Sequence, residues 1–257
     1  MANRDLKMRD VNNFLSVVFH GTADHEKFCG GLQTAINQIS SAGVFAGDNL
    51  FTFGRNLGFM NDECLMKAYN DNATTEVEKS VLWRLATVAW GFRKGLQLDG
   101  DFVECGCYKG TTAKIMCDMA DFSSYPDRRY YLYDLFDHDS AMPHHSMPEH
   151  SQFLFQKTRE RFSQFSNVVV TQGQVPDILS EVSPGKIAFM HIDLNNAEAE
   201  VGALEVLFDR MVPGAVLVFD DYGWLAYGDQ KKAEDHWLAS RGYQVLELPT
   251  GQGLLIK

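Results

Sequence analysis

Two nearly uninterrupted apolar segments constrain the fold of this chain more than any other feature. Residues 186–193 read Lys-Ile-Ala-Phe-Met-His-Ile-Asp, and residues 215–221 read Ala-Val-Leu-Val-Phe-Asp-Asp. A strand without polar alternation is buried on both faces, which is typical of a parallel sheet covered by two layers of helices. Residues 200–211, between the two segments, carry apolar side chains at helical spacing. The chain therefore predicts the strand–helix–strand order of an α/β fold.

The remaining pattern from residue 100 onward extends this sheet. Further strands are expected at 102–105, 130–134 and 168–171, and helices at 111–119 and 153–165. The chain ends with 243–248 and 254–257, separated by Pro-Thr-Gly-Gln-Gly, which indicates a hairpin. We predict a Rossmann-like sheet that is mostly parallel, has a C-terminal antiparallel hairpin and carries helices on both faces.

The first part of the chain has a different pattern. It is mostly helix and loop, and Thr74-Thr-Glu-Val-Glu indicates a helix start that continues to about Gly95. We therefore expect an N-terminal helical segment or lid at 1–98 and one cofactor-binding domain at 99–257. The N-terminal segment would cover the substrate and could supply a homo-oligomer contact.

Composition excludes several classes of function. The net charge is −11, and Lys and Arg never cluster beyond a pair, which argues against a nucleic-acid partner. The five cysteines are odd in number and lack CxxC spacing, so neither a disulfide framework nor a zinc knuckle is expected. The chain begins without a signal-peptide pattern and has no apolar run of about 20 residues. We expect a soluble, cytoplasmic protein with no membrane partner.

The first chemical signal is the turn after the strand at 102–105. It contains Glu104, Gly106, Tyr108 and Gly110, followed by Thr111 at the start of a helix. Glycines let a backbone turn tightly beside a ligand, and the helix start offers free N–H groups. The middle glycine of GxGxxG is missing, which argues against a dinucleotide. An acidic residue before the first glycine is instead typical of S-adenosylmethionine sites; the alternative is a plain tight turn.

Strand-end carboxylates give two further signals. Asp134 ends the strand at 130–134, where a carboxylate can accept both hydroxyls of a ribose, unless it is only solvated. Asp193 ends one apolar strand, and Asp220 and Asp221 end the next. Three carboxylates at one sheet edge would repel one another, so we expect a hard cation such as Mg²⁺ or Ca²⁺ there. The alternative is that one or two of them cap neighbouring helices.

Histidines gather in one loop, at 138, 144, 145 and 150. Such side chains can act as bases or bind a metal near neutral pH. A solvated, mobile lid is the interpretation we favour for this loop. His191, inside an apolar strand, is expected to be a core residue.

The motifs together resemble those of the macrocin O-methyltransferase family. The resemblance rests on Asp101-Phe-Val-Glu-Cys-Gly-Cys-Tyr-Lys-Gly, His191-Ile-Asp-Leu-Asn and Phe219-Asp-Asp-Tyr-Gly, spread over residues 80–257. It implies a class I methyltransferase fold and metal-dependent O-methylation of a sugar in an antibiotic or polysaccharide pathway. It also implies Mg²⁺ ligands at Asp193, Asp220 and Asp221. The cofactor-binding residues that it implies, with those of the turn, are Glu104, Gly106, Tyr108, Gly110, Thr111, Asp134, Gly173, Gln174 and Asp193.

One departure concerns the catalytic base. Relatives in that family place it two or three residues after the first metal ligand, where this chain has Asn195 and Asn196. An amide is not a useful base at neutral pH, so the base lies elsewhere, or metal and solvent suffice. The candidates are Asp193, Glu198, Glu200, His144 and His145. The departure also keeps a non-catalytic S-adenosylmethionine-binding subunit open, and a nicotinamide-dependent oxidoreductase is the other alternative.

Overall fold

The computed structural model describes residues 12–138 and 146–257 and divides into two compact units, Met1–Leu82 and Trp83–Lys257. His144 and His145 lie outside the described residues. The sequence predicts a boundary at residue 98. The structure places it at Leu82, because the helix that follows packs on the large sheet of the second unit. Each unit is described by itself below.

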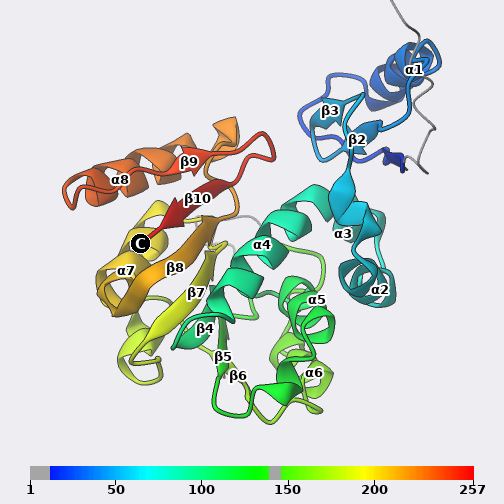
Figure 1. Cartoon of the computed structure of the whole chain (residues 1–257). Coiled ribbons are helices and arrows are strands. Elements are labelled where there is room, and N and C mark those ends of the chain that lie inside the picture. Colours follow the sequence, from blue (N-terminus) through cyan, green and yellow to red (C-terminus); the bar gives the residue numbers. More distant parts are fainter. Residues whose placement is uncertain (1–11, 139–145) are drawn as a thin grey trace, which may run out of the picture. The chain divides into compact units, whose positions relative to one another are not determined.

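The first unit combines short helices with a small sheet (Figure 1). Its strands are β1 (Phe14–Leu15), β2 (Phe45–Gly47) and β3 (Leu50–Thr52), in the order β1-β2-β3. Its helices are α1 (His25–Ile36), α2 (Glu63–Asn72) and α3 (Glu76–Ser80). Strand β1 is parallel to β2, and β3 is antiparallel to β2. The sequence analysis expected helix and loop here and did not anticipate the three strands, which are only two or three residues long.

The helix start at Thr75 is the one that the sequence indicates. The Thr75 hydroxyl accepts a hydrogen bond from the backbone N–H of Glu78, and the Glu78 carboxylate accepts one from the backbone N–H of Thr75. This reciprocal capping box satisfies two N–H groups that a helix start otherwise leaves unpaired. The helix does not run on to Gly95, however, because Val81 has φ −83° and ψ 18°. The chain forms α3 and then a separate helix, α4 (Leu82–Gly95).

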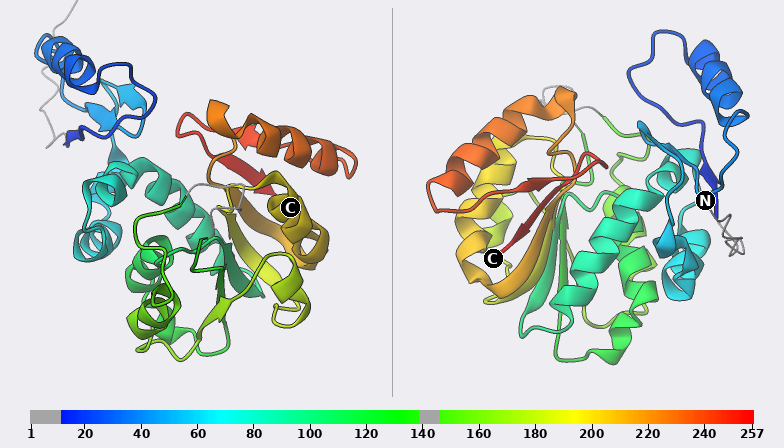
Figure 2. Two further views of the ribbon diagram at one scale, coloured as in Figure 1. Left: turned by 180° about the vertical axis from the view of Figure 1, so that it is seen from behind. Right: turned by 45° about the horizontal axis from the view of Figure 1, so that its top comes forward.

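The second unit is built on a seven-stranded sheet (Figures 1 and 2). Its order is β6-β5-β4-β7-β8-β10-β9. The strands are β4 (Asp101–Cys105), β5 (Tyr130–Asp134), β6 (Val168–Gln172), β7 (Ile187–Ile192), β8 (Met211–Phe219), β9 (Leu246–Glu247) and β10 (Gly253–Ile256). Strands β4 to β8 pair in parallel, and β10 is antiparallel to both β8 and β9. The predicted parallel sheet with a C-terminal antiparallel hairpin is confirmed.

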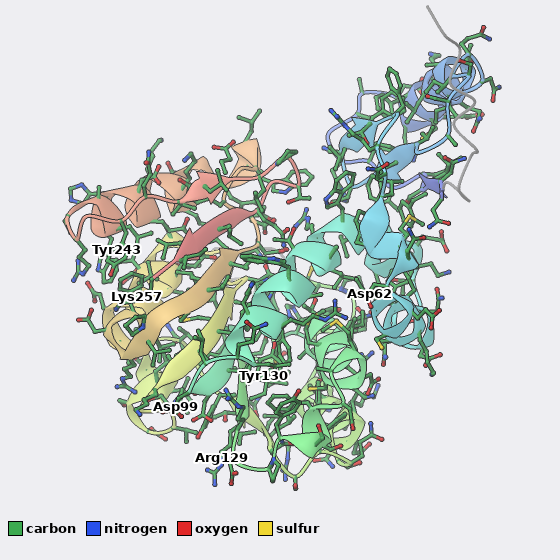
Figure 3. The ribbon with its side chains drawn as sticks, in the orientation of Figure 1. Asp62, Asp99, Arg129, Tyr130, Tyr243 and Lys257 are labelled. Carbon is green, nitrogen blue, oxygen red and sulfur yellow. The ribbon has the colours of Figure 1, made fainter. Side chains whose placement is uncertain are left out.

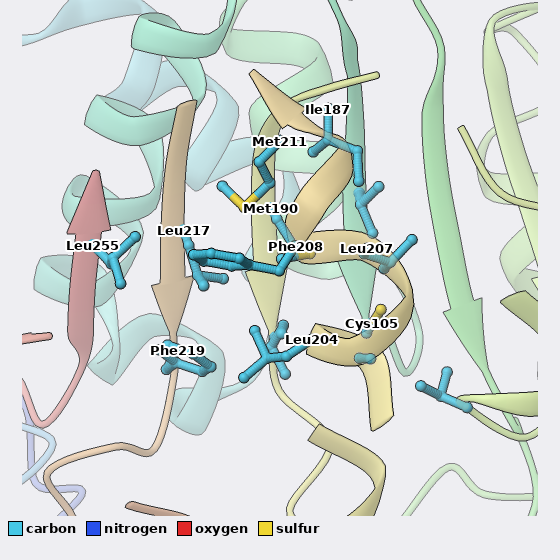
Figure 4. Close-up of a cluster of buried hydrophobic side chains, with 14 of the residues drawn as sticks. Cys105, Ile187, Met190, Leu204, Leu207, Phe208, Met211, Leu217, Phe219 and Leu255 are labelled. Carbon is cyan, nitrogen blue, oxygen red and sulfur yellow. The ribbon is translucent and has the colours of Figure 1, made fainter. Parts of the chain in front are cut away.

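Helices cover both faces of this sheet. They are α4, α5 (Thr111–Met119), α6 (Leu154–Arg161), α7 (Ala197–Leu207) and α8 (Gly228–Ala239). Helix α4 approaches one face closely, since a Cβ on Gly91 would lie 2.8 Å from Cε2 of Phe189 on β7. Figure 4 shows the core on the other face, where Leu204, Leu207 and Phe208 meet Met190 and Leu217. Helix α8, which the sequence analysis did not expect, adds Trp237 and Leu238 to this core.

The topology brings the carboxyl ends of β4, β5, β7 and β8 to one edge of the sheet. The order changes direction between β4 and β7, and ligands of open α/β sheets bind outside the carboxyl ends of the strands at such a switch point. The predicted site residues lie near the carboxyl ends of these four strands, or in the segments that follow these strands or β6. Among the described residues, no helix combines the length and apolarity needed to cross a membrane.

Candidate active site

A cavity of about 910 Å³ opens at this edge of the sheet. Its wall is contributed by the turn after β4, the end of β5, the loop after β6, the loop after β7 and helix α7. The predicted residues that line it are Gly106, Tyr108, Asp134, Gly173, Gln174, Asp193 and Glu198. Segments separated by more than 90 residues along the sequence therefore share one cavity, whose volume is in the usual range for a small-molecule site.

The turn after β4 has a backbone that only glycine adopts easily. Gly106 has φ 88°, and a Cβ there would lie 1.8 Å from the carbonyl oxygen of Asp193. The N–H groups of Gly106 and Cys107 donate to the Tyr133 carbonyl oxygen at 2.8 and 3.1 Å, which ties the turn to the end of β5. The glycine thus allows the loops after β4 and β7 to touch beside the cavity.

Asp134 is held in place by backbone donors. Its Oδ2 accepts a hydrogen bond from the N–H of Tyr108 at 2.7 Å, and its Oδ1 accepts one from the N–H of Phe136 at 2.6 Å. Because a carboxylate oxygen can accept more than one hydrogen bond, these contacts orient the side chain and are compatible with a diol ligand. Asp134 therefore joins the turn after β4 to the end of β5 and faces the cavity.

The acidic pair after β8 is bound by a cation from the protein itself. The Arg84 guanidinium, on α4, donates to Asp220 Oδ2 at 2.8 Å and to Asp221 Oδ1 at 3.1 Å. All three side chains are 12–15% exposed. Asp220 Oδ1 also accepts a hydrogen bond from the Gln252 amide at 2.9 Å. The sequence predicts an external cation for these carboxylates, whereas the structure places an arginine of the chain itself beside two of them.

Burial and mutual repulsion shift the pKa values of the acids at this edge of the sheet. Burial raises the pKa of Asp193 well above its ordinary value, and the charge of Asp220 adds to the increase. Burial and the charge of Asp220 also raise the pKa of Asp221, to about 7, despite Arg84. For Asp220 burial acts in the same direction, but Arg84 and His191 outweigh it and hold its pKa below the ordinary value. Arg84 and His191 therefore favour the ionised form of Asp220.

The carboxylates of Asp193, Asp220 and Asp221, as the structure arranges them, do not form a site for a divalent cation. Both oxygens of Asp220 accept hydrogen bonds from protein donors, and Arg84 already bridges Asp220 and Asp221. Within residues 12–138 and 146–257, no group of three or more His, Cys, Asp or Glu side chains is arranged to hold a metal ion. Asp220 and Asp221 are also absent from the described cavity lining, whereas Asp193 belongs to it.

Glu104 is placed in the sheet rather than in the cavity lining. It is 2% exposed, and its Oε2 accepts a hydrogen bond from the hydroxyl of Tyr130, labelled in Figure 3, at 2.5 Å. His191 lies between two acids, with Nδ1 3.7 Å from Glu104 Oε2 and Nε2 3.6 Å from Asp220 Oδ1. It is a buried residue, as the sequence analysis expected, but its neighbours are charged rather than apolar.

Gly110 and Thr111 also lie outside the described cavity lining. Gly110 is the N-cap residue of α5, and Thr111 Oγ1 accepts a hydrogen bond from Arg161 at 3.1 Å. Their cofactor-binding role stays a prediction. Both residues stand at the start of α5. In this structure they form the connection between the turn and that helix.

The two asparagines that replace the expected base have structural roles. Asn196 is the N-cap residue of α7, where its side chain accepts the N–H of Ala199 at 3.0 Å. Asn195 has φ 54° and donates from its amide to Asp193 Oδ1 at 3.4 Å. Short polar side chains suit a helix cap and a left-handed backbone, which gives a physical reason for amides at these positions.

Among the candidate bases, the structure separates Glu198 from Glu200. Glu198 is exposed and lines the cavity. Glu200 is 2% exposed, and its Oε1 accepts hydrogen bonds from the N–H of Leu194 at 3.1 Å and from Gln230 at 3.0 Å. Glu200 therefore holds the loop after Asp193 through Leu194 and is absent from the described cavity lining.

A signal for Arg84 was present in the sequence. Positions 84, 88, 91 and 95 fall on one face of a helix, and Val88, Gly91 and Gly95 belong to the buried side of α4. An arginine on such a face needs a buried carboxylate partner. The pattern could have predicted that the partner is acidic, but only the fold shows that it is Asp220 with Asp221.

Comparisons with known proteins agree with this geometry. Residues 103–222, a little under half of the chain, match a family model described as a methyltransferase domain. This segment runs from β4 through Tyr222 and contains the turn, Asp134 and all three acids of the sheet edge. Residues 103–222 are therefore similar to a methyltransferase domain, and this likeness includes most of the wall of the cavity.

Two solved structures share the fold at low identity. The O-methyltransferase NovP is 17% identical, with a TM-score of 0.59 over 70% of this chain and 81% of its own. CalS11, a TDP-rhamnose 3′-O-methyltransferase of calicheamicin biosynthesis, is 16% identical, with a TM-score of 0.55 over 93% of this chain and 97% of its own. These likenesses establish the class I methyltransferase fold. No curated protein sequence matches the chain, and the narrower macrocin O-methyltransferase family stays a prediction.

Proposed function

We propose that this protein transfers the methyl group of S-adenosylmethionine to a hydroxyl oxygen of a sugar or a glycosylated small molecule. The observation that carries the proposal is the cavity in which the turn after β4, Asp134 and Asp193 come together. Its lining is rich in carboxylates: Asp134, Asp137, Asp177, Asp193, Glu198 and Glu205. A lining of this charge favours a cationic ligand, and the cofactor carries a sulfonium and an ammonium group.

Each side of the cavity would bind one part of the cofactor. Asp134 would accept the two ribose hydroxyls, since its carboxylate is already oriented by Tyr108 and Phe136. Gly106 and Tyr108 would bring the backbone close to the methionine portion, and Gly173 with Gln174 would contact the adenine. These roles agree with the order of the strands, because β6, β5 and β4 are consecutive neighbours in the sheet.

The chain's own contribution to the reaction is positioning and proton removal. When bound, the cofactor supplies an electrophilic methyl group on sulfur, so the carbon–sulfur bond breaks as the oxygen–carbon bond forms. The acceptor hydroxyl loses its proton in the same process. Asp193 and Glu198 are the predicted acids that line the cavity and can accept this proton. Holding the hydroxyl oxygen in line with the methyl group would supply much of the rate.

Three considerations support a sugar as acceptor. NovP and CalS11 are O-methyltransferases by name, and the name of CalS11 includes a nucleotide-linked sugar. The cavity also offers Asn195, Asn196 and Glu198 beside Asp193, and amides and carboxylates are suitable partners for several hydroxyl groups. A compound with many hydroxyl groups therefore suits this wall better than an apolar acceptor.

Calorimetric titration of S-adenosylhomocysteine into the full chain tests the cofactor. We expect binding, and we expect Asp134→Ala to weaken it by about tenfold or more because the ribose loses a charged acceptor. Asp99→Ala is the matched control, since it removes an exposed carboxylate that pairs with Lys186 just before β4. Binding of NADH without S-adenosylhomocysteine would instead establish the oxidoreductase alternative.

Turnover is tested separately, on a panel of nucleotide sugars and glycosides, by the release of S-adenosylhomocysteine. Parallel reactions with Mg²⁺ and with EDTA test the metal dependence that the sequence predicts. Methylation of a sugar hydroxyl would establish the activity. Cofactor binding without transfer to any member of the panel would favour the non-catalytic subunit.

A further inference from the structure

An arginine side chain lies beside the acidic residues that follow β8, at the edge of the proposed site. Arg84 lies in the first turns of α4, and its side chain is 12% exposed. It bridges Asp220 and Asp221, and its guanidinium carbon lies 4.9 Å from the centre of the Trp224 ring. A planar guanidinium that bridges carboxylates and stacks on an aromatic ring is fixed in its position.

The same carboxylates are the predicted metal ligands, and Asp220 has both oxygens occupied. Oδ2 accepts from Arg84, while Oδ1 accepts from the Gln252 amide and lies 3.6 Å from His191 Nε2. Gln252 is fully buried, so its amide needs this partner. A divalent cation bound to Asp220 would have to displace a charged donor and leave buried polar groups without partners, which costs free energy.

We infer that Arg84 is the resident cation of this acidic edge and performs the neutralising role that a divalent metal would otherwise have. The guanidinium holds Asp220 and Asp221 in place after β8, and of these three acids Asp193 is the one that lines the cavity. Arg84 is thus a positioning residue, and a divalent cation is not required for cofactor binding. The inference rests on the proposed function only for the identity of that cofactor.

Mn²⁺ binding followed by electron paramagnetic resonance, together with thermal unfolding in EDTA and in Mn²⁺, tests this directly. Wild-type protein should show no tight Mn²⁺ site and the same melting temperature in both conditions. Arg84→Gln removes the cation and leaves two buried carboxylates side by side. It should melt at a lower temperature in EDTA and regain part of the loss in Mn²⁺, with Mn²⁺ affinity raised by about tenfold or more.

Two further variants separate this role from a general effect on folding. Lys94→Gln removes one positive charge from an exposed position of the same helix, where the ammonium lies 5.9 Å from the Trp90 ring centre. It should behave as wild type. Arg84→Lys keeps the charge but cannot bridge both carboxylates in the same way, so it should restore metal independence while recovering only part of the stability.

Tight Mn²⁺ binding by the wild type, or loss of its S-adenosylhomocysteine affinity in EDTA, would overturn the inference. So would an Arg84→Gln protein whose metal response equals that of Lys94→Gln. Failure of S-adenosylhomocysteine to bind under any condition would contradict the proposed function instead. The metal measurements would still decide the role of Arg84, because they use no cofactor.

Discussion

Replacement of Glu234 by glutamine should stabilise this protein at pH 8 and have little effect at pH 5. Glu234 lies on α8, is 0% exposed and faces Glu200 of α7, which is 2% exposed. Neither carboxylate oxygen of Glu234 has a donor within hydrogen-bonding distance among the described residues. Two facing carboxyl groups form a hydrogen bond only while one of them keeps a proton, so the wild-type pair depends on that proton.

The sign of the effect follows from the directions of the pKa shifts. Burial raises the pKa of Glu200, and Glu234 raises it further. Burial raises the pKa of Glu234 too; Asp235 and Asp221 act in the same direction, whereas Glu200 and Lys231 lower it. Both folded-state pKa values therefore lie above the ordinary value of 4.5. The pair contributes its full stability below that value and loses it as the pH rises through the folded-state pKa.

The expected stabilisation by Glu234→Gln depends on the cost of one buried carboxylate that has no hydrogen-bond donor among the described residues. Leaving a buried polar group unsatisfied costs about 1–3 kcal/mol, and a charged group costs more. A glutamine amide can donate to Glu200 at any pH and removes the charge. For a unit of 150–250 residues each kcal/mol shifts the melting temperature by about 2–4 °C. We therefore expect Glu234→Gln to melt about 2–12 °C above wild type at pH 8.

Differential scanning calorimetry at pH 5 and pH 8 measures this difference. Asp229→Asn is the matched control, since it removes one carboxylate from an exposed position of the same helix, where it pairs with Lys232. It should change the melting temperature little, because surface ion pairs contribute little. Equal destabilisation by Glu234→Gln at both pH values would refute the shared proton and would mean that the amide simply fits the site badly.

Two further predictions concern the cavity wall. Gly106→Ala should lower the free energy of unfolding by about 2–5 kcal/mol, because its Cβ would overlap the Asp193 carbonyl oxygen and its φ is positive. Chemical denaturation measures this free energy. A loss below about 1 kcal/mol would mean that the loops after β4 and β7 separate easily. Glu198→Gln should lower kcat by about 100-fold while S-adenosylhomocysteine affinity stays unchanged; full turnover in this variant would leave Asp193 as the proton acceptor.

The sequence predicted the sheet well because its strands are buried on both faces. Segments such as 186–193 have no polar alternation, so their type and their parallel pairing follow from composition alone. The C-terminal hairpin was predictable for a different reason, because the turn residues Pro-Thr-Gly-Gln-Gly separate its two strands. Helix α8 was missed because charged residues interrupt its apolar pattern, as in Gly228-Asp-Gln-Lys-Lys-Ala-Glu-Asp. The break at Val81 was missed because nothing in its side chain opposes a helix strongly.

The candidate site was predictable in position but not in its contacts. Strand ends meet at one edge of a parallel sheet, so Asp134, Asp193 and the acids after β8 could be grouped from the sequence. Which of them face a ligand depends on side-chain direction and on partners that are distant in the sequence. Glu104 and Glu200 both looked available for chemistry, yet each is buried and accepts hydrogen bonds from neighbouring elements. Only packing distinguishes such groups.

The acids of the sheet edge illustrate that a sequence can reveal a need for positive charge without revealing which group supplies it. Three carboxylates brought together do need a positive charge. Asp220 lies 136 residues from Arg84 along the sequence, so a metal was the available explanation. The fold supplies the charge through α4, which Gly91 lets approach the sheet. Arg84 then neutralises the two acids outside the described cavity lining. Of the three, Asp193 is the acid that lines the cavity, where a cationic cofactor would supply its counter-charge.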